Sequence, residues 1–480
     1  MKNYGYYGKI LLSINSEVNI MKMFFTMLLV KPIIFIMNLL GFSATNLPGN
    51  ICLKIFPDIL AHFKMPKYVI FVTGTNGKTL SAITISHIFR EKGMTVVNNN
   101  EGSNLDSGLI SKLIKNSTFT GKIKADAAVL EVDEDATAKM CNILKPSHLM
   151  ITNIYRDSIS RNAHPEFVLR KLRKVPGDVC LVLNGDDALS GMLGTDENRK
   201  IFYTVDKAPD RDDKCENLIC DIRTCPVCHM PIKYEYIQFH HIGKFHCEHC
   251  GFEMPEGDVQ AGDIDYEKRT FVLREKDGKT TEFPFSTGNL YEVYNNTAIA
   301  ALCLDLGFDG KFISDSIKSL SSTGGRYKED VANDTAIISM VGKSQNPISC
   351  SQSFAKAKMI DGKKVIIIAI NDRVYGGHDH NEDTSWFYDT DFEFLVSDDV
   401  LQYIVVGHRM YDVALRLVMA GADEDKILLT PEYDLSAAKM VDYDAVKGGS
   451  ILYFFEVYFR EWSVKMKEAL LAEAKAHEKH

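Results

Sequence analysis

Short apolar runs alternate with helix-like stretches through the first part of the chain. The apolar runs cover residues 68–72, 94–97, 127–130, 148–152 and 179–183. A helical pattern over residues 81–90 separates the first two runs and ends at Gly93. Strand-length apolar runs that alternate with helices predict a parallel α/β sheet. Ligands bind at the carboxyl ends of such strands, so the polar residues that follow the runs are the candidate site.

The pattern changes after residue 205 and later returns. Residues 206–224 are charged and irregular, whereas residues 268–285 alternate like a hairpin around Asp277-Gly278, a favoured tight turn. A second α/β block begins near residue 334, with apolar runs at 336–338, 365–369, 403–406 and 451–455. The chain is therefore expected to be an α/β protein with one domain over 61–323 and another over 324–480.

Residues 1–60 are expected to form an apolar helical segment. Residues 24–40 are almost wholly apolar, but Lys31-Pro32 interrupts them. The uninterrupted runs are shorter than the roughly 20 residues needed to span a bilayer. We therefore expect a helical element that packs on the domain, and an interfacial membrane contact and a membrane span remain as alternatives.

Composition places the chain among ordinary globular proteins. Its 480 residues carry 55 Lys and Arg against 64 Asp and Glu, a net charge of −9, and 45% are hydrophobic. This acidic balance argues against a broad nucleic-acid-binding surface. The 11 cysteines are odd in number and mostly scattered, which favours a reducing compartment over a disulfide framework.

A phosphate-binding loop follows the first apolar run. Its residues are Gly74, Thr75, Asn76, Gly77, Lys78 and Thr79. Glycines let backbone N–H groups converge on phosphate oxygens, and the N-terminus of the next helix adds a positive dipole. Lys78, taken as a surface-loop lysine, is expected to reach the β- and γ-phosphates of a bound nucleotide, and Thr79 to hold Mg²⁺. The similar Gly278-Lys279-Thr280 lies in the hairpin, without a strand-to-helix turn, and is not expected to bind phosphate.

Acidic residues end two other runs. Glu131, Asp133 and Glu134 follow the third run, and Asp186 and Asp187 follow the fifth. Mg²⁺ bound to a nucleotide takes one or two carboxylates from the protein. Glu131 is the preferred magnesium ligand, and a solvated loop carboxylate is the alternative.

Four cysteines form a zinc-binding pattern. Cys225 with Cys228, and Cys247 with Cys250, make two C-x-x-C pairs separated by 18 residues. Each pair places two thiolates on one tight turn, and two such turns complete a tetrahedron around Zn²⁺. A redox pair, the alternative, needs only one C-x-x-C. Because a closed Cys₄ site is structural, we expect no catalysis from this insert of about residues 215–260.

Together these motifs resemble the Mur ligase superfamily and, within it, the MurT family. The resemblance spans roughly residues 45–460. Its marks lie at residues 47–49, 74–79, 98–104, 130–134, 152–157, 184–187, 294–295, 325–326, 346–347, 371–372 and 383–386. The most discriminating mark is a zinc ribbon inside a Mur ligase core.

The resemblance implies an ATP-binding domain with a parallel sheet, an inserted zinc ribbon and a Rossmann-like C-terminal α/β domain. It implies ATP-dependent amidation of the α-carboxylate of D-glutamate in the lipid II stem peptide, through an acyl phosphate, to give D-isoglutamine. Ammonia would come from a class I glutaminase-like partner of the GatD type in a heterodimer. The enzyme would act in the cytoplasm, at the inner face of the cytoplasmic membrane.

The same match implies roles for single residues. Lys78 and Glu131 would act in catalysis, Asn295 would lie near adenine, and Arg326 near the phosphates; a capping or loop amide is the alternative for Asn295. In this family an aspartate of the ligase subunit orients the histidine of the partner's Cys–His pair. The matching stretch makes Asp383 the candidate, with a helix N-cap as the structural alternative. Asp372 and Asp379 are the other candidates for this role.

Departures from the family pattern keep two other functions open. They fall at Leu80, at residues 158–164 and 343–349, in the loop between 371 and 383, and at 455–458. One alternative is a divergent Mur-type ligase that joins an amine to a different carboxylate. The other is a nucleotide-binding subunit without catalytic turnover.

Overall fold

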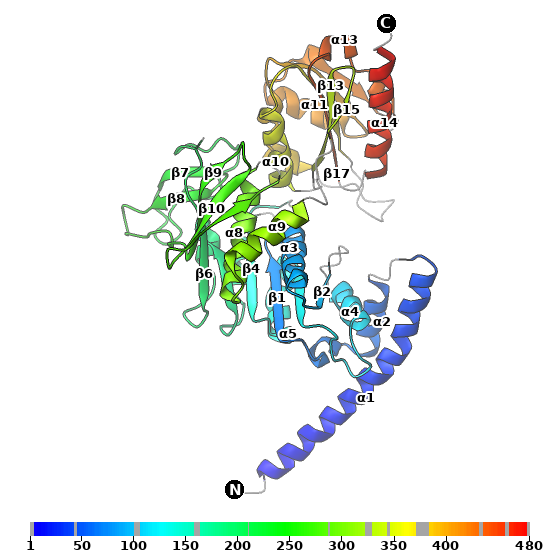
Figure 1. Ribbon diagram of the computed structural model, residues 1–480, viewed down its shortest axis with the longest axis vertical. Coiled ribbons are helices and arrows are strands. Elements are labelled where there is room, and N and C mark those ends of the chain that lie inside the picture. Colours follow the sequence, from blue (N-terminus) through cyan, green and yellow to red (C-terminus); the bar gives the residue numbers. More distant parts are fainter. Residues whose placement is uncertain are drawn as a thin grey trace. The chain divides into compact units, whose positions relative to one another are not determined.

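The chain forms two compact units, each assembled from several stretches of sequence (Figure 1). The computed structural model describes residues 4–42, 46–99, 106–157, 164–209, 211–286, 289–321, 329–342, 346–370, 384–431, 435–456 and 460–477. Unit 1 comprises Met1–Ile154, Val168–Asp210 and Gly251–Ser321. Unit 2 comprises Tyr155–Phe167, Arg211–Cys250 and Ser322–His480, so the four-cysteine insert groups with the C-terminal part of the chain.

Unit 1 is built on a nine-stranded sheet with the order β11-β10-β9-β6-β5-β4-β1-β3-β2. Its strands are β1 Tyr68–Thr73, β2 Val96–Asn98, β3 Ala127–Glu131, β4 His148–Ile151, β5 Cys180–Asn184, β6 Lys200–Val205, β9 Val259–Asp265, β10 Thr270–Glu275 and β11 Thr280–Pro284. Neighbours from β2 through β9 pair in parallel, and β9, β10 and β11 pair antiparallel. The α/β class is confirmed, and the five apolar runs form five adjacent parallel strands, β5-β4-β1-β3-β2.

Helices cover the sheet of unit 1, and strands β1, β3, β4 and β5 are buried on both faces, which explains their continuous apolar character. They are α2 Leu47–Ile55, α3 Lys78–Glu91, α4 Asp106–Lys115, α5 Glu134–Leu144, α7 Ala188–Gly191, α8 Leu290–Asp305 and α9 Gly310–Ser321, with the 3₁₀ turn η1 Ile59–His62. Helix α6 Pro165–Leu172 crosses from unit 2 into unit 1. Gly278 turns the β10–β11 hairpin with a φ of 89°, and Lys279 pairs with Asp309 at 2.9 Å. The second Gly-Lys-Thr is thus part of a hairpin, as expected.

Helix α1, Tyr4–Leu39, continues through Pro32, although Lys31-Pro32 interrupts its apolar sequence. Proline removes one helical N–H, but tertiary contacts hold the helix on both sides of it. Lys31 Nζ donates to the carbonyls of Ile114 at 2.7 Å and Ser117 at 2.8 Å, where α4 ends. By length and composition, Glu17–Leu39 is a helix long and apolar enough to cross a membrane.

Unit 2 contains a six-stranded mixed sheet with the order β12-β13-β17-β14-β15-β16. The strands are β12 Glu329–Ala332, β13 Thr335–Gly342, β14 Lys364–Ala369, β15 Val400–Val406, β16 Ile427–Thr430 and β17 Ser450–Glu456. Only the β12–β13 pair in this sheet is antiparallel. Separate apolar clusters form on its two faces.

The remaining elements of unit 2 flank this sheet or belong to the four-cysteine insert. The helices are α10 Pro347–Lys358, α11 Met410–Met419, α12 Ser436–Lys439, α13 Tyr443–Val446 and α14 Arg460–His477, with the 3₁₀ turns η2 Ser385–Asp389, η3 Phe392–Leu395 and η4 Glu424–Lys426. The insert contains one antiparallel hairpin, β7 Lys233–Phe239 with β8 Ile242–His246.

The Lys31 contacts predict that Lys31→Met loosens α1 from α4. Methionine keeps the aliphatic stem but loses both charged hydrogen bonds, which we expect to cost about 1–2 kcal/mol of local stability. Hydrogen exchange at the end of α4 should therefore accelerate. The matched control is Lys22→Met, an exposed position of the same helix. Equal exchange in the two variants would show that Lys31 does not hold the helix.

Candidate nucleotide site and zinc ribbon

Strand β1 passes into helix α3 through a tight turn at residues 74–77. Gly74 and Gly77 have φ angles of 121° and 86°, in the region that favours glycine. A Cβ atom at Gly74 would lie 2.3 Å from Thr152 Oγ1, and one at Gly77 would lie 2.7 Å from Asn295 Oδ1. The backbone approaches its neighbours more closely than a side chain allows, as in loops whose N–H groups surround phosphate.

The residues that follow β4 brace this turn. Thr152 Oγ1 donates to the Asn76 carbonyl at 2.6 Å, and Asn153 Nδ2 donates to the same carbonyl at 3.1 Å. In return, the Asn76 N–H donates to Asn153 Oδ1 at 2.9 Å. The Thr75 N–H donates to the Asn153 carbonyl at 3.1 Å. These hydrogen bonds fix the loop against the neighbouring strand before any ligand binds.

Lys78 is buried at the start of α3, so the expectation of a surface-loop lysine is wrong. Its side chain is 5% exposed, and Nζ donates to the Gly74 carbonyl at 2.5 Å and to Glu134 Oε1 at 3.0 Å. Glu134 is 2% exposed, and its Oε2 has no hydrogen-bond partner within the described ranges. The pair is buried because Glu134 begins α5 beside the loop, although 55 residues separate the two positions in sequence.

Thr79, in the first turn of α3, lies beside Glu131, the last residue of β3. Thr79 Oγ1 donates to Glu131 Oε2 at 2.7 Å. Asn99 holds the backbone of Glu131 with two 2.8 Å hydrogen bonds, one to its carbonyl and one from its N–H. The Glu131 carboxylate is thus placed by its strand and by an amide clamp, next to the hydroxyl of Thr79.

Asp186 and Asp187 serve the backbone. Asp186 accepts from the Val205 N–H at 2.7 Å and from the Tyr294 hydroxyl at 2.8 Å. Asp187 caps α7 and accepts from the Ile154 N–H at 3.1 Å. Both carboxylates therefore have structural partners, whereas Glu131 lies at the phosphate loop.

These residues fit a nucleoside triphosphate with its Mg²⁺. The turn brings backbone N–H groups, the start of a 14-residue helix and the Lys78 ammonium to one edge of the sheet. The Thr79 hydroxyl and the Glu131 carboxylate are oxygen ligands of the kind Mg²⁺ prefers. Asn295 lies beside Gly77, and its contact with adenine stays a prediction. Arg326, Asp383, Asp372 and Asp379 lie outside the described residues.

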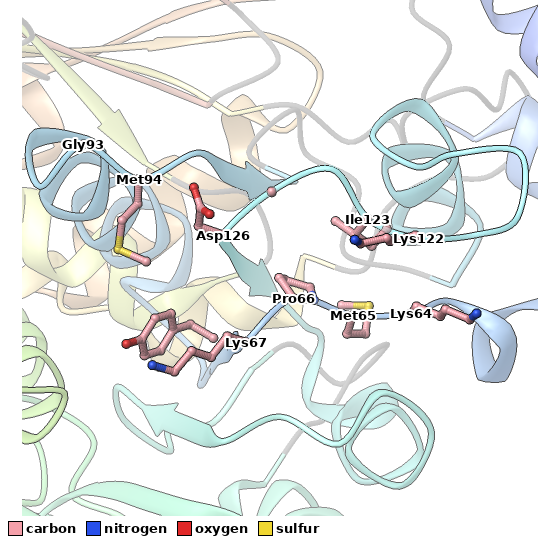
Figure 2. A pocket seen from close by; sticks show the side chains of 11 residues that line it. Lys64, Met65, Pro66, Lys67, Gly93, Met94, Lys122, Ile123 and Asp126 are labelled. Atoms are coloured by element: carbon pink, nitrogen blue, oxygen red, sulfur yellow. The ribbon is translucent and has the colours of Figure 1, made fainter.

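A surface hollow of about 810 Å³ lies at the opposite edge of the same sheet (Figure 2). Lys64, Lys67 and Lys122 line it, near the amino ends of β1 and β3. Asp126, also in the lining, is held by the N–H and hydroxyl of Thr95, and these hydrogen bonds lower its pKa. The hollow is separate from the nucleotide site.

In unit 2, the four cysteines gather as a zinc site requires. All four sulfur atoms lie within 4.8 Å of one another. The Cys225–Cys250 and Cys228–Cys247 sulfur pairs are 3.7 Å and 3.6 Å apart. A zinc tetrahedron with Zn–S bonds of about 2.3 Å has edges of about 3.8 Å, so the site fits Zn²⁺. The backbone N–H of Cys250 lowers the pKa of Cys247 to about 6, which favours the thiolate.

The insert is attached to the rest of unit 2 by an ion-pair network. Arg156 binds Asp221, at the base of the insert, and Asp389, at the end of η2, the latter at 3.1 Å. Burial lowers the pKa of Arg156, but the two carboxylates raise it by more. His240 and His241 pack edge-on against the Tyr155 ring. These two histidines lie outside the cysteine cluster.

Two family models match the chain. The Mur ligase middle domain matches residues 72–248, which include the phosphate loop and Glu131. The MurT ligase C-terminal domain matches residues 344–458 of unit 2. Both matched domains are those of Mur ligases, and within that superfamily the chain resembles MurT.

Curated relatives support the resemblance. The chain is 28% identical, over 409 residues, to the MurT subunit of the glutamine-hydrolysing lipid II isoglutaminyl synthase of Staphylococcus aureus strain COL, a match that covers 84% of this chain and 89% of the relative. It is 29% identical, over 440 residues, to the MurT subunit of Streptococcus pneumoniae, covering 89% of this chain and 94% of the relative.

Solved structures share the fold. A pseudomurein peptide ligase type C from Methanothermus fervidus aligns with a TM-score of 0.63 at 20% identity, covering 87% of this chain and 80% of that one. MurF from Thermotoga maritima, solved in complex with ADP, aligns with a TM-score of 0.56 at 15% identity, covering 89% and 84%. At these identities the likeness establishes the Mur ligase fold.

Sequence reasoning assigned no role to three side chains that shape the site. Glu134 pairs with Lys78, Asn99 clamps Glu131, and Asn153 braces Asn76. Each follows an apolar run, so each falls where a parallel sheet collects its ligands. The position of each residue after an apolar run therefore marked it as a candidate. Its partner lies at the end of a different strand, and the sequence of one strand does not predict which residue that is.

The cysteine geometry predicts about one Zn²⁺ per chain. Cys225→Ser or Cys250→Ser should release the metal and accelerate hydrogen exchange across the β7–β8 hairpin, because metal binding and folding are coupled. The matched control is Cys220→Ser, a half-buried cysteine outside the cluster. Metal analysis of purified protein reports the result. A full complement of zinc in Cys250→Ser would contradict the assignment.

Proposed function

We propose that the chain is the ligase subunit of a lipid II amidotransferase. In this proposal, the enzyme converts the α-carboxylate of D-glutamate in the stem peptide into an amide, giving D-isoglutamine. Ammonia comes from a class I glutaminase-like subunit of the GatD type, bound as a heterodimer. The chain is an ATP-dependent ligase of the Mur superfamily, and its curated relatives are MurT subunits of lipid II isoglutaminyl synthases.

One observation carries the proposal for this chain's own chemistry. Lys78, Thr79 and Glu131 converge at the carboxyl edge of the unit 1 sheet, on a turn that admits no side chain at Gly74. Such a site supplies a cation, backbone donors and metal ligands for transfer of a phosphoryl group. ATP with Mg²⁺, when bound, would supply the phosphoryl group that activates the acceptor carboxylate for attack by ammonia.

The roles of the residues follow from their positions. Lys78 and the loop N–H groups would stabilise the negative charge that develops on the transferred phosphoryl group. Glu134 holds the Lys78 ammonium at the loop, and Thr79 and Glu131 would hold the metal. Arg326 is proposed to lie near the phosphates, and Asp383 to orient the catalytic histidine of the partner.

Because Lys78 and Glu134 form a buried ion pair, the phosphate loop cannot be tested by replacing Lys78 alone. Lys78→Met alone would leave the Glu134 carboxylate buried and uncompensated, a loss of about 3–5 kcal/mol. The double variant Lys78→Met/Glu134→Gln removes both charges and should fold. We expect its ATP-dependent amidation, measured with glutamine and partner, to fall at least ~100-fold.

The matched control is Lys279→Met in the other Gly-Lys-Thr. Lys279 sits in the exposed β10–β11 hairpin and should be dispensable. Mass spectrometry of lipid II after incubation with ATP, Mg²⁺ and glutamine reports conversion of a carboxyl to a carboxamide. Unchanged activity in the double variant would remove residues 74–79 from the proposed mechanism. ATP turnover without any lipid II product would instead indicate a different acceptor.

The role of Asp383 predicts a dependence on the nitrogen source. A carboxylate that only orients a histidine matters when glutamine is hydrolysed, and removing it costs about 10⁴-fold in a triad enzyme. Asp383→Asn should therefore be nearly inactive with glutamine and nearly normal with ammonium at raised pH. Asp398→Asn, at an exposed aspartate of unit 2, is the matched control. Equal loss of activity with both nitrogen sources would place Asp383 in the ligase site or in the fold. Full activity with both sources would shift the role to Asp372 or Asp379.

A further inference from the structure

Helix α1 has one face packed on unit 1 and another, apolar face that unit 1 leaves exposed. The packed face is a stripe of buried residues at helical spacing, Met23, Met27, Val30 and Ile34. On the opposite side lie exposed residues that we call the outer face, Val18, Met21, Phe25, Leu28, Leu29, Phe35, Ile36 and Leu39. Helix geometry places these two sets about 180° apart around the axis.

The outer face is long and continuous. Residues 18–39 of a helix extend for about 32 Å at a rise of 1.5 Å per residue. Phe24, at its margin, lies against Phe119 of the loop after α4, with ring centroids 5.8 Å apart. Leu40 and Phe42 continue the exposed apolar surface beyond the helix. A contiguous apolar surface of this length marks a site of interaction with a protein or a membrane.

The charge around the outer face differs from that of the whole chain. Residues 17–67 and 112–124 supply α1 and segments packed beside it, and they contain nine lysines and two acidic residues, Glu17 and Asp58. The full chain, in contrast, has a net charge of −9. Three of these lysines, Lys64, Lys67 and Lys122, line the hollow described above (Figure 2). Gly121, next to Lys122, lies against Met23 of α1.

We propose that the outer face of α1 lies flat on an anionic lipid bilayer. An apolar helix face with lysines at its margin is the pattern of an interfacial helix, whose apolar side enters the acyl boundary while lysines meet anionic headgroups. The surface complements an anionic bilayer in both apolar character and charge. This inference stands on α1 and its surroundings and does not depend on the proposed reaction.

Two features favour an in-plane helix over a membrane span. Four buried side chains join one side of α1 to the protein, and a span would have to expose them to lipid. Lys31 is tied to the end of α4 by two hydrogen bonds.

Vesicle sedimentation of the full chain tests the proposal. Wild type should bind phosphatidylcholine vesicles more tightly when they contain phosphatidylglycerol. Phe25→Ser/Leu29→Ser/Ile36→Ser replaces three exposed side chains, so the fold should persist, and the partition coefficient should fall about tenfold for each one. The matched control, Met359→Ser/Leu415→Ser/Met419→Ser, changes three exposed apolar residues of unit 2 and should bind as wild type.

A second variant tests the basic rim. Lys112→Gln/Lys115→Gln should weaken binding to anionic vesicles about fivefold per lysine and leave binding to neutral vesicles unchanged. Equal binding of the triple-serine variant and wild type would overturn the proposal. The proposal would also be overturned if wild type did not bind vesicles but formed dimers that the triple-serine variant could not form. The outer face would then bind a second copy of the chain.

Tryptophan depth distinguishes the two membrane geometries. Met21→Trp, Leu29→Trp and Leu39→Trp place an indole at positions spread over about 27 Å of helix. Quenching by brominated lipids should report the same shallow depth for all three in an in-plane helix. A deep Leu29→Trp between two shallow ends would show a span and overturn the in-plane arrangement.

Discussion

Burial of the Lys78 ammonium is the constraint on which the nucleotide site depends. A buried cation costs several kcal/mol unless it is paired and hydrogen-bonded. The chain meets this cost with the Gly74 carbonyl and the Glu134 carboxylate. Glu134 is in reach because β1 and β3 are parallel neighbours, with Val72 beside Glu131 in register. The adjacency of two strands therefore determines where the loop, the candidate metal ligands Thr79 and Glu131, and the compensating charge meet.

The same edge is preorganised by amides rather than by long charged side chains. Asn99 and Asn153 each bind the backbone of a neighbouring segment through both ends of the carboxamide. A carboxamide donates and accepts at once, so it fixes two strands relative to each other without adding charge. The charged groups that remain at the edge are thus held in place and available for a ligand, which is the arrangement that electrostatic catalysis requires.

The sequence was sufficient to predict those strands that are buried on both faces and are therefore uniformly apolar. Strands β1, β3, β4 and β5 are covered on both faces, and their runs predicted them. Strands β6 and β9 were not predicted, because polar residues interrupt their apolar pattern. The hydrogen bonds that hold α1 at Lys31 are made to the end of α4, which no local pattern records. The burial of Lys78 was not predicted for the same reason, because its partner Glu134 belongs to a different element. The roles of Arg326 and Asp383 remain predictions.

The interleaved order of the two units has a consequence for how the protein can be divided. The backbone passes from one unit to the other five times, near residues 154, 167, 210, 250 and 321. A single proteolytic cut or stop codon therefore cannot release either unit whole. A fragment that starts at residue 322 would lack the four-cysteine insert and the Arg156 ion pair that unit 2 contains. Unit 1 is likewise incomplete until Gly251–Ser321, which follows the four-cysteine insert, has been synthesised and has joined the earlier strands. Unit 1 therefore cannot finish folding on the ribosome before this later segment is made.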